Sequence, residues 1–423
     1  MKISFRRAPL VCVIACWSAS SAAAGPGSIT LREALDLAAA RNPALVAFES
    51  QTSAAREEAA LQALAPSPVV ELQFENFAGT GDLSGAKALE STLQLSKVVE
   101  LGGKADARRM LGDSQLEKLA SEQGAQRVDA AAEVARRFVE VLADQERLAA
   151  FERSVSLAEE TTRAVRTRVQ AGAASPVQSS RAEIALARAR IEAEHAEHEL
   201  RSSRVALSVQ WGETDPRFTE VRGSLFGLDE PEQFDRYAQR IENNPALNTF
   251  ASGQRVLEAR TRLAQSLRRP SLTFNVGVRR LEAVDDAALV AGVAMPFGGS
   301  RRADGELRAV AAERTTLTLT QQAHRLDVHS TLFSVYQELT HARAEALALR
   351  ERIRPQAQQM LETTEAGYRA GRFSFLELAD AQRQLLDIDL DAIQAAAQFH
   401  LQLIEVERLT GQSMLTLAKG NTP

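Results

Sequence analysis

The sequence predicts a mainly α protein with a small β part, made of two tandem repeats that contain long antiparallel coiled-coil helices. Three observations predict it. Asn42-Pro43-Ala44-Leu45 recurs as Asn244-Pro245-Ala246-Leu247, and Ala171-Gly172 recurs as Ala370-Gly371. Each half also holds two stretches that alternate apolar and polar residues, followed by a long stretch almost free of proline. A repeat of this length is a whole structural module used twice, not a short solenoid unit.

Residues 1–24 predict a secretory signal peptide. They have a basic start, an apolar run over 8–17 and small residues at 22–24, in the order that such signals show. An alternative stays open, because Val13-Ile14-Ala15-Cys16 resembles a lipoprotein cleavage box that would leave Cys16 lipidated. Cys12 and Cys16 are the only cysteines, so we expect neither disulfides nor thiolate chemistry in the mature chain.

The charge of the chain argues against a nucleic-acid partner. The formal net charge is −5, and removal of the three basic residues in the signal makes it more negative by three units. No later segment has enough consecutive apolar residues, about 18, for a transmembrane helix. No grouping of Ser, His and acidic residues suggests catalysis, so we expect no enzyme activity, no cofactor and no bound metal.

The first repeat is residues 25–212. Asn42 separates two predicted helices, and Pro43 is suited to the first turn of the second helix. Period-two alternation predicts a β-hairpin at about 69–98. The expected elements are helices over 31–41 and 45–64, strands over 69–77 and 89–98, a long helix over 104–170, a turn at Gly172, and a return helix that ends at Trp211-Gly212.

A linker, residues 213–230, leads to the second repeat, residues 231–411, which is followed by a C-terminal tail, 412–423. Residues 315–320 alternate threonine and leucine as a strand would, so a strand is the alternative to the helix predicted for this segment. The expected elements are helices over 231–243 and 247–267, a β-hairpin at about 272–297 with strands over 272–278 and 289–297, a long helix over 301–370, a turn at Gly371, and a return helix to Thr410-Gly411.

Apolar residues in the long helices recur at steps of three and four, which predicts helices packed along their length. One seam comprises Leu148, Phe151, Val155, Ala158, Thr162, Val165 and Val169. The other comprises Leu386, Leu390, Ile393, Ala397, His400 and Ile404. A helix over 104–170 would reach about 100 Å, which a compact domain cannot use.

Four strands are too few to close a membrane barrel, and the open edges of a sheet cannot face lipid. If these strands enter a membrane, several copies must therefore share one barrel, with the long helices forming a tube below it. The alternative is a water-soluble coiled-coil stalk that carries two hairpins. Aromatic residues that would mark a membrane interface are few: Phe74, Phe77, Phe274 and Phe297.

Over nearly its whole mature length the chain resembles the TolC family of outer-membrane efflux proteins. The Asn-Pro-Ala-Leu starts, the Ala-Gly turns and the ends at Trp211-Gly212 and Thr410-Gly411 are habits of that family. Glu100-Leu101-Gly102-Gly103-Lys104 is similar to the outer-membrane component of cobalt–zinc–cadmium efflux systems. The resemblance implies a homotrimer with a shared 12-stranded outer-membrane β-barrel above a twelve-helix periplasmic tunnel, in a Gram-negative bacterium.

The same resemblance implies a passive duct for divalent heavy-metal cations of the cobalt, zinc, cadmium and nickel class. Its partners would be outer-membrane lipid, a periplasmic membrane-fusion adaptor and an inner-membrane proton-driven pump of the RND type. Two alternatives stay open: a drug or protein-export duct of the same family, and a periplasmic coiled-coil scaffold protein.

The resemblance also implies an entrance at the second turn. Glu377 and Asp380 match acidic positions of the family, and their spacing places both on one helix face. Threefold repetition would form a carboxylate ring, which favours cations, whereas a solvated acidic face is the alternative. Tyr368 matches a tyrosine that helps to hold the entrance closed. Arg181, in the first repeat, is positioned to pair with Asp380 and weaken the ring.

The turns at Gly172 and Gly371 are the expected adaptor-docking points. His195 and His198 are spaced as metal ligands can be, but two ligands without a third do not make a site, so a charged outer helix face is the preferred interpretation. His400 lies in a seam and is expected to be packed.

Overall fold

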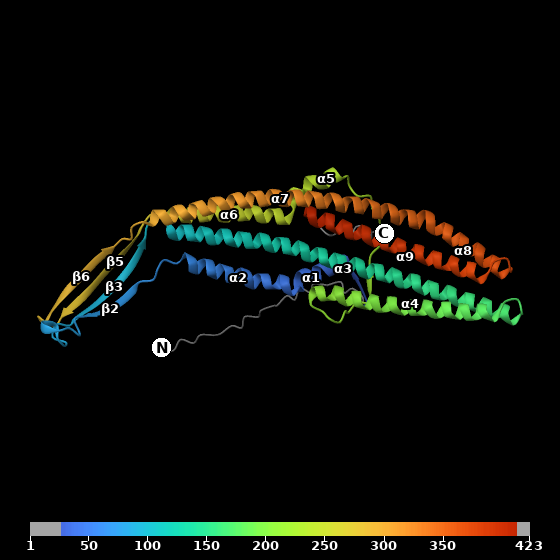
Figure 1. The fold of residues 1–423 in the computed structure, drawn as a ribbon, viewed down its shortest axis with the longest axis horizontal. Helices are drawn as coiled ribbons and strands as arrows, with labels where there is room; N and C mark the ends of the chain where they lie inside the picture. Colours follow the sequence, from blue (N-terminus) through green and yellow to red (C-terminus); the bar gives the residue numbers. More distant parts are fainter. Residues whose placement is uncertain (1–26, 413–423) are drawn as a thin grey trace, which may run out of the picture.

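The computed structural model describes residues 27–412, and the predictions for the signal peptide and for 413–423 lie outside this range. The chain forms a long rod with the β-sheet at one end and two helical turns at the other (Figure 1). Among the described residues, no helix is both long and apolar enough to cross a bilayer.

The first half follows the predicted order. Thr30 and Glu33 form a capping box at the start of α1, and the Asn42 side chain caps α2. Pro43 lies in the first turn of α2, as predicted. The long helix has the predicted bounds. The elements are β1 (Ser28–Thr30), α1 (Leu31–Arg41), α2 (Pro43–Ala63), β2 (Val69–Glu75), β3 (Glu90–Glu100), α3 (Lys104–Gln170) and α4 (Pro176–Ser208).

The second half repeats the order with two differences. The helix predicted over 231–243 is shorter, because α5 ends at Gln239 and a 3₁₀ turn follows it. The long helix is interrupted at Leu349–Ile353 by a π-helical turn just before Pro355, which has no amide hydrogen to donate. The elements are α5 (Phe234–Gln239), α6 (Pro245–Ser266), β5 (Ser271–Leu281), β6 (Asp286–Ala294), α7 (Gly299–Ala348), α8 (Arg354–Arg369) and α9 (Phe375–Thr410).

The alternating segment from Thr315 to Thr320 is helical and lies inside α7. Thr315, Thr316 and Thr318 each donate a hydroxyl hydrogen bond to the carbonyl four residues earlier. These bonds satisfy the hydroxyl groups within the helix, so local alternation does not decide the structure here.

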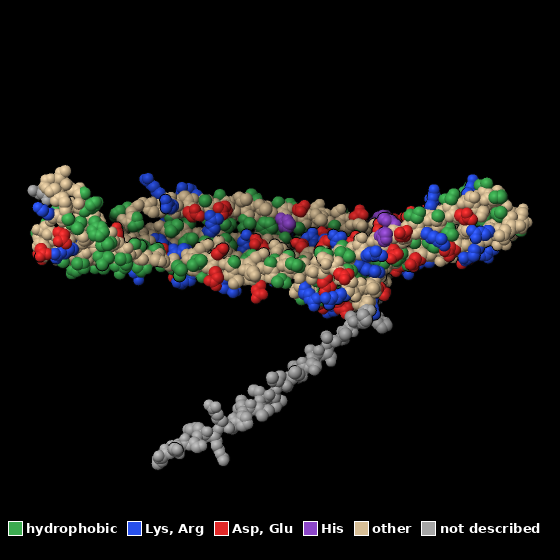
Figure 2. Space-filling model, turned by 90° about the horizontal axis from the view of Figure 1, so that it is seen from below, with side chains coloured by type: hydrophobic (Ala, Val, Ile, Leu, Met, Phe, Trp, Pro, Cys, Tyr) green, Lys and Arg blue, Asp and Glu red, His purple; other side chains and the backbone are tan. Residues whose placement is uncertain are grey.

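The sheet is antiparallel, in the order β2-β3-β5-β6, with β2 and β6 as its free edges in one chain. Register places Leu95 between Val70 and Val276, and Val276 next to Ala291. One face is therefore apolar and exposed, and we call it the apolar face of the sheet. Its residues include Val70, Leu72, Phe74, Leu93, Leu95, Phe274, Val276, Val278, Leu289 and Val293. Hydrophobic side chains gather visibly at this end of the molecule (Figure 2).

The helices form one curved layer with two unpartnered edges. Near the sheet, α3 packs against α2 and α6, and α6 packs against α7. Toward the turns, α3 packs against α4 and α9, and α9 packs against α8. The edges of the layer are thus α2 and α4 on one side, and α7 and α8 on the other, as the ribbon shows (Figure 1).

The largest core lies midway along the rod, where the 213–230 linker packs onto the helices. Phe218, Val221 and Leu225 of this linker are buried, and β4 (Glu220–Arg222) pairs with β1. His400, predicted to be packed, is 2% exposed, and its Nε2 lies 2.8 Å from the Leu225 carbonyl oxygen. Burial lowers the pKa of His400, so the ring is neutral.

Candidate functional site: the helical entrance

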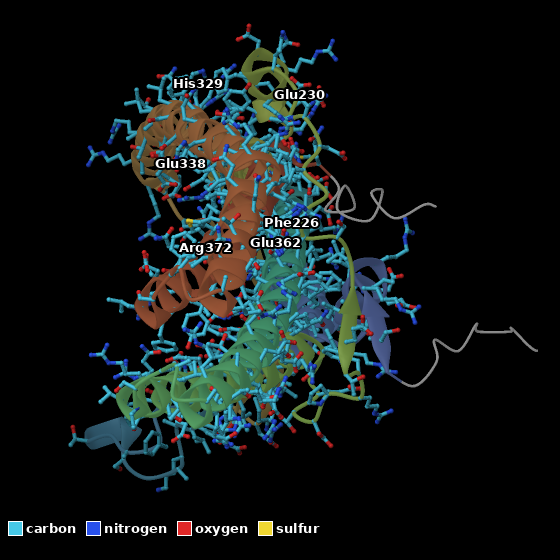
Figure 3. All side chains as sticks on the ribbon, turned by 90° about the vertical axis from the view of Figure 1, so that its right-hand side faces the viewer. Phe226, Glu230, His329, Glu338, Glu362 and Arg372 are labelled. Atoms are coloured by element: carbon cyan, nitrogen blue, oxygen red, sulfur yellow. The ribbon has the colours of Figure 1, made fainter. Side chains whose placement is uncertain are left out.

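The two turns at the far end of the rod are built alike. Gly172 and Gly371 have φ angles of 71° and 76°, a left-handed conformation that glycine adopts without steric cost. Ser175 caps α4, and Ser374 caps α9. Viewed from this end, Arg372 marks the α8–α9 turn, and the α3–α4 hairpin forms a second arm (Figure 3). Sequence reasoning predicted both turns.

Tyr368 is buried between the two arms. It is 2% exposed, and its hydroxyl lies 3.4 Å from Oε1 of Gln178 on α4. Arg168, in the last turn of α3, stacks on the Tyr368 ring and donates a hydrogen bond to its carbonyl oxygen. Sequence reasoning missed Arg168. The only available signal was a basic residue near a helix C-terminus, which is common for capping reasons alone.

Glu377 helps to cap the start of helix α9. Its carboxylate accepts a hydrogen bond of 2.6 Å from the Ser374 amide, while the Glu377 amide donates to the Ser374 hydroxyl. These two bonds form a capping box at the start of α9. The Ser374 amide lowers the pKa of Glu377, so this exposed group remains an anion at neutral pH. Glu377 therefore stabilises the start of α9, which the alternative of a solvated acidic face did not include.

The predicted pair of Glu377 and Asp380 is part of a longer row of acidic residues on α9. Oδ2 of Asp380 accepts a hydrogen bond of 2.8 Å from Gln384 of the next turn. The exposed carboxylates of α9 recur at helical spacing, and we call them the acidic stripe. The acidic stripe comprises Glu377, Asp380, Asp387 and Asp391.

The first repeat carries basic residues at two of the four positions that are equivalent to the acidic stripe. Arg181 and Arg188 of α4 are exposed and stand at the positions equivalent to Asp380 and Asp387, at the same offset that relates Gly172 to Gly371. Within one described chain Arg181 forms no ion pair, so the suggested pair with Asp380 is absent between these two arms. Arg188 was not among the residues predicted for the entrance from the sequence.

The histidines do not assemble a metal site in the described part of the chain, where no group of three or more potential ligands occurs. Nε2 of His195 lies 3.3 Å from Oε1 of Glu199, one turn further along α4, and both side chains are exposed. This arrangement agrees with the charged outer helix face preferred from the sequence.

Comparison with known proteins finds a match to a known family in the first half of the chain. Residues 34–213 match the family described as outer membrane efflux protein. The cobalt-zinc-cadmium resistance protein CzcC of Cupriavidus metallidurans is 28% identical over 390 residues, which cover 92% of this chain and 91% of that protein. The nickel-cobalt-cadmium resistance protein NccC of Alcaligenes xylosoxydans xylosoxydans is 24% identical over 320 residues, covering 74% of this chain and 71% of that protein.

Solved structures agree on the fold. CusC superposes with a TM-score of 0.74 at 14% identity, covering 90% of this chain and 92% of CusC. A membrane protein from Pseudomonas aeruginosa superposes with a TM-score of 0.68 at 19% identity, covering 90% and 93%. The scaffold alternative has no support from these matches. Residues 34–213 thus match the outer membrane efflux protein family, and the chain has the fold of TolC-like outer-membrane channels.

Proposed function

We propose that three copies of this chain close into one outer-membrane duct that exports divalent heavy-metal cations as the outer part of a three-component pump. The observation that carries the proposal is the open layer. Within one described chain, the helix layer has two uncovered edges, and the outer edges of strands β2 and β6 are free. A second copy can cover both kinds of edge at once, and repetition by rotation leaves none.

The edge helices carry exposed apolar residues at heptad spacing, which suits helix–helix packing between copies. On α4, Val177, Ile184 and Ile191 are 58%, 56% and 63% exposed. On the opposite edge, α7 exposes Leu319, Leu326 and Phe333, while Ile353 and Met360 lie along the π turn and α8. Stripes of this kind on a solitary helix layer would face water at a cost, whereas a neighbour would bury them.

The strands have the length that a membrane requires. β3 and β5 have 11 residues each. At about 3.3 Å per residue and a tilt near 40°, such strands cross roughly 25–30 Å, the thickness of the hydrocarbon core. Pairing of β6 with β2 of the next copy would satisfy both free edges and close a 12-stranded barrel.

The charge of the entrance favours cations. The acidic stripe on α9 would recur three times around a tunnel, and rings of carboxylates select cations. Arg181 and Arg188 reduce this field without cancelling it, since they oppose only two of the four carboxylates. The two relatives described above are named for resistance to cobalt, zinc, cadmium and nickel, and the proposed cargo belongs to that class.

The turns at Gly172 and Gly371 end the rod on the side away from the sheet. A periplasmic membrane-fusion adaptor would dock there and connect the duct to an inner-membrane RND pump. Chemistry and energy input would reside in the pump, so the duct itself needs no catalytic group.

Growth inhibition of a strain that lacks this gene tests the cargo. We expect sensitivity to cobalt, zinc, cadmium or nickel, restored by the wild-type gene and not by a vector control. Sensitivity to dyes or antibiotics alone, with unchanged tolerance to all four metals, would contradict the metal assignment and favour a drug duct.

A further inference from the structure

We propose that the apolar face of the sheet holds an anionic phospholipid at its helix-proximal end. Lys97 would bind the lipid phosphate, and a hollow beside it would take an acyl chain. The inference rests on the proposed membrane insertion. It adds a specific ligand and a specific place to it, in the leaflet that faces the periplasm.

The hollow lies across three strands. Its volume is about 490 Å³. It exists because β6 contributes only small residues at its centre, Ala291 and Gly292, while neighbouring strands contribute larger side chains. The lining residues are Leu95, Lys97, Phe274, Asn275, Val276, Ala291, Gly292 and Val293.

Lys97 is the one charged residue in that lining. It pairs in register with Phe274, and its side chain is exposed on the same face as Leu95. Among the described residues it has neither an ion pair nor a side-chain hydrogen bond with a partner. A lysine on a lipid-facing surface carries its ammonium toward the interface, where phosphate groups lie.

The orientation of the hollow fits a lipid. Lys97 stands nearer to the helices than Leu95 does, because β3 runs toward α3. From Lys97 the hollow continues past Leu95 and Val276, toward the middle of the strands. A phospholipid of the periplasmic leaflet has the same polarity, with its phosphate toward the helices and its chains toward the bilayer centre.

More unpaired cations surround this end of the sheet. Arg301 and Arg302 are exposed in the first turn of α7, and Arg269 is exposed where α6 leads into β5. None of the three has an ion pair among the residues that the structure describes. Phe297, which precedes α7, is 87% exposed and fits the aromatic position at a membrane interface.

The opposite end of the sheet is different. There Arg280, on the same apolar face, pairs with Asp285 and Glu282. Arg280 is therefore neutralised by the chain itself, whereas Lys97 has no ion pair among the described residues. Lys87, in the exposed turn at this far rim, also has no ion pair among the described residues, but it does not line the hollow. The position of Lys97 beside the hollow therefore points to this place for an anionic headgroup.

Native mass spectrometry of the purified, delipidated full chain in detergent tests the proposal, with phosphatidylglycerol as the anionic probe and phosphatidylcholine as the zwitterionic comparison of no net charge. We expect wild type to bind phosphatidylglycerol more tightly. Lys97→Gln should weaken that binding about fivefold, since one basic residue near a lipid surface contributes roughly that factor. Lys87→Gln, at the exposed far-rim turn, is the matched control and should leave binding unchanged.

A second variant tests the hollow without changing charge. Ala291→Phe should fill it and weaken phosphatidylglycerol binding while the channel still inserts and conducts. Equal binding of both lipids by wild type, or equal effects of the Lys97 and Lys87 variants, would overturn the headgroup site. Unchanged binding in Ala291→Phe would overturn the acyl-chain site. A wild-type protein that never inserts into membranes would instead contradict the proposed function itself.

Discussion

The guanidinium carbon of Arg168 lies 4.8 Å from the centroid of the Tyr368 ring, and the same group donates to the Tyr368 carbonyl oxygen. One side chain of the α3–α4 arm thus holds both the ring and the backbone of the α8–α9 arm. Burial raises the pKa of Tyr368 despite the nearby positive charge, so its hydroxyl is neutral throughout the physiological range. These two contacts of Arg168 with Tyr368 join the arms at the entrance, and we call them the clasp.

Removal of this clasp should widen the entrance. In Arg168→Ala, the stacked cation and the hydrogen bond to the Tyr368 carbonyl are lost together, so the two arms are expected to separate more readily. We expect the single-channel conductance of the purified protein in planar bilayers to rise at least twofold.

Arg166 provides the matched control for this experiment. It is exposed and pairs with Glu183 within its own arm, so Arg166→Ala removes an arginine nearby without touching the contact between arms. Equal conductance in the Arg168 variant and the wild type would show that Arg168 does not restrain the entrance.

Ion selectivity should depend on Asp380 and Asp387, the residues of the acidic stripe that follow the capping residue Glu377. Asp380→Asn together with Asp387→Asn removes two negative charges per chain while keeping shape, so we expect the permeability ratio of cations over anions to fall severalfold in reversal-potential measurements. Arg181→Gln should act in the opposite direction.

Glu377→Gln separates charge from folding in the same assay. Glutamine can keep the capping box with Ser374, so this variant loses only the charge. A cation preference that survives in all three neutralised positions would mean that the stripe does not line the pathway.

Much of this architecture follows from the sequence because its determinants are local. Pro43 and Pro245 fix helix starts, Gly172 and Gly371 fix helix ends, and long stretches without proline fix the helices between them. Alternation placed the four strands within a few residues of their observed bounds, for example Glu90–Glu100 for the predicted 89–98.

The parts that the sequence did not reveal depend on contacts between distant segments. Arg168 meets Tyr368 only because two arms from different repeats lie side by side. The burial of Phe218 and Leu225 in the linker likewise requires the helices that cover them. The bond between Glu377 and Ser374 is different, because their Ser-x-x-Glu spacing is a local capping-box signature that the prediction for Glu377 did not use.

Trimer closure should depend on the exposed apolar residues of α4. Ile184→Asp places a charge at the centre of the stripe formed with Val177 and Ile191, and burial of an unpaired charge between copies is costly. We expect this variant to shift from trimer to monomer in size-exclusion chromatography with light scattering. Ala185→Asp, at the next position, which is also exposed, should remain trimeric. Trimeric Ile184→Asp protein would exclude this stripe from the interface.

Glu407 should make the stability of the rod depend on pH. This residue of α9 is 2% exposed, and among the described residues its Oε2 has no hydrogen-bond partner. Burial raises the pKa of Glu407 to about 8, compared with about 4.3 for an unperturbed glutamate. Between these values the folded chain keeps a proton that the unfolded chain releases. The contribution of this group to stability is thus complete below pH ~4 and is lost as pH rises toward 8.

Glu407→Gln should therefore gain thermal stability relative to wild type as the pH rises. We expect melting temperatures, measured by fluorimetry in detergent, to differ little at pH 5 and by a few degrees in favour of the variant at pH 8. Glu405 is the control of opposite sign. Burial alone would raise its pKa, but hydrogen bonds and charge from Arg408 and Arg136 lower it overall. Glu405→Gln should thus be less stable than wild type at both pH values, because it loses an ion pair that is formed above pH ~4. A Glu407 variant whose advantage is the same at pH 5 and pH 8 would show that this carboxyl does not titrate between them.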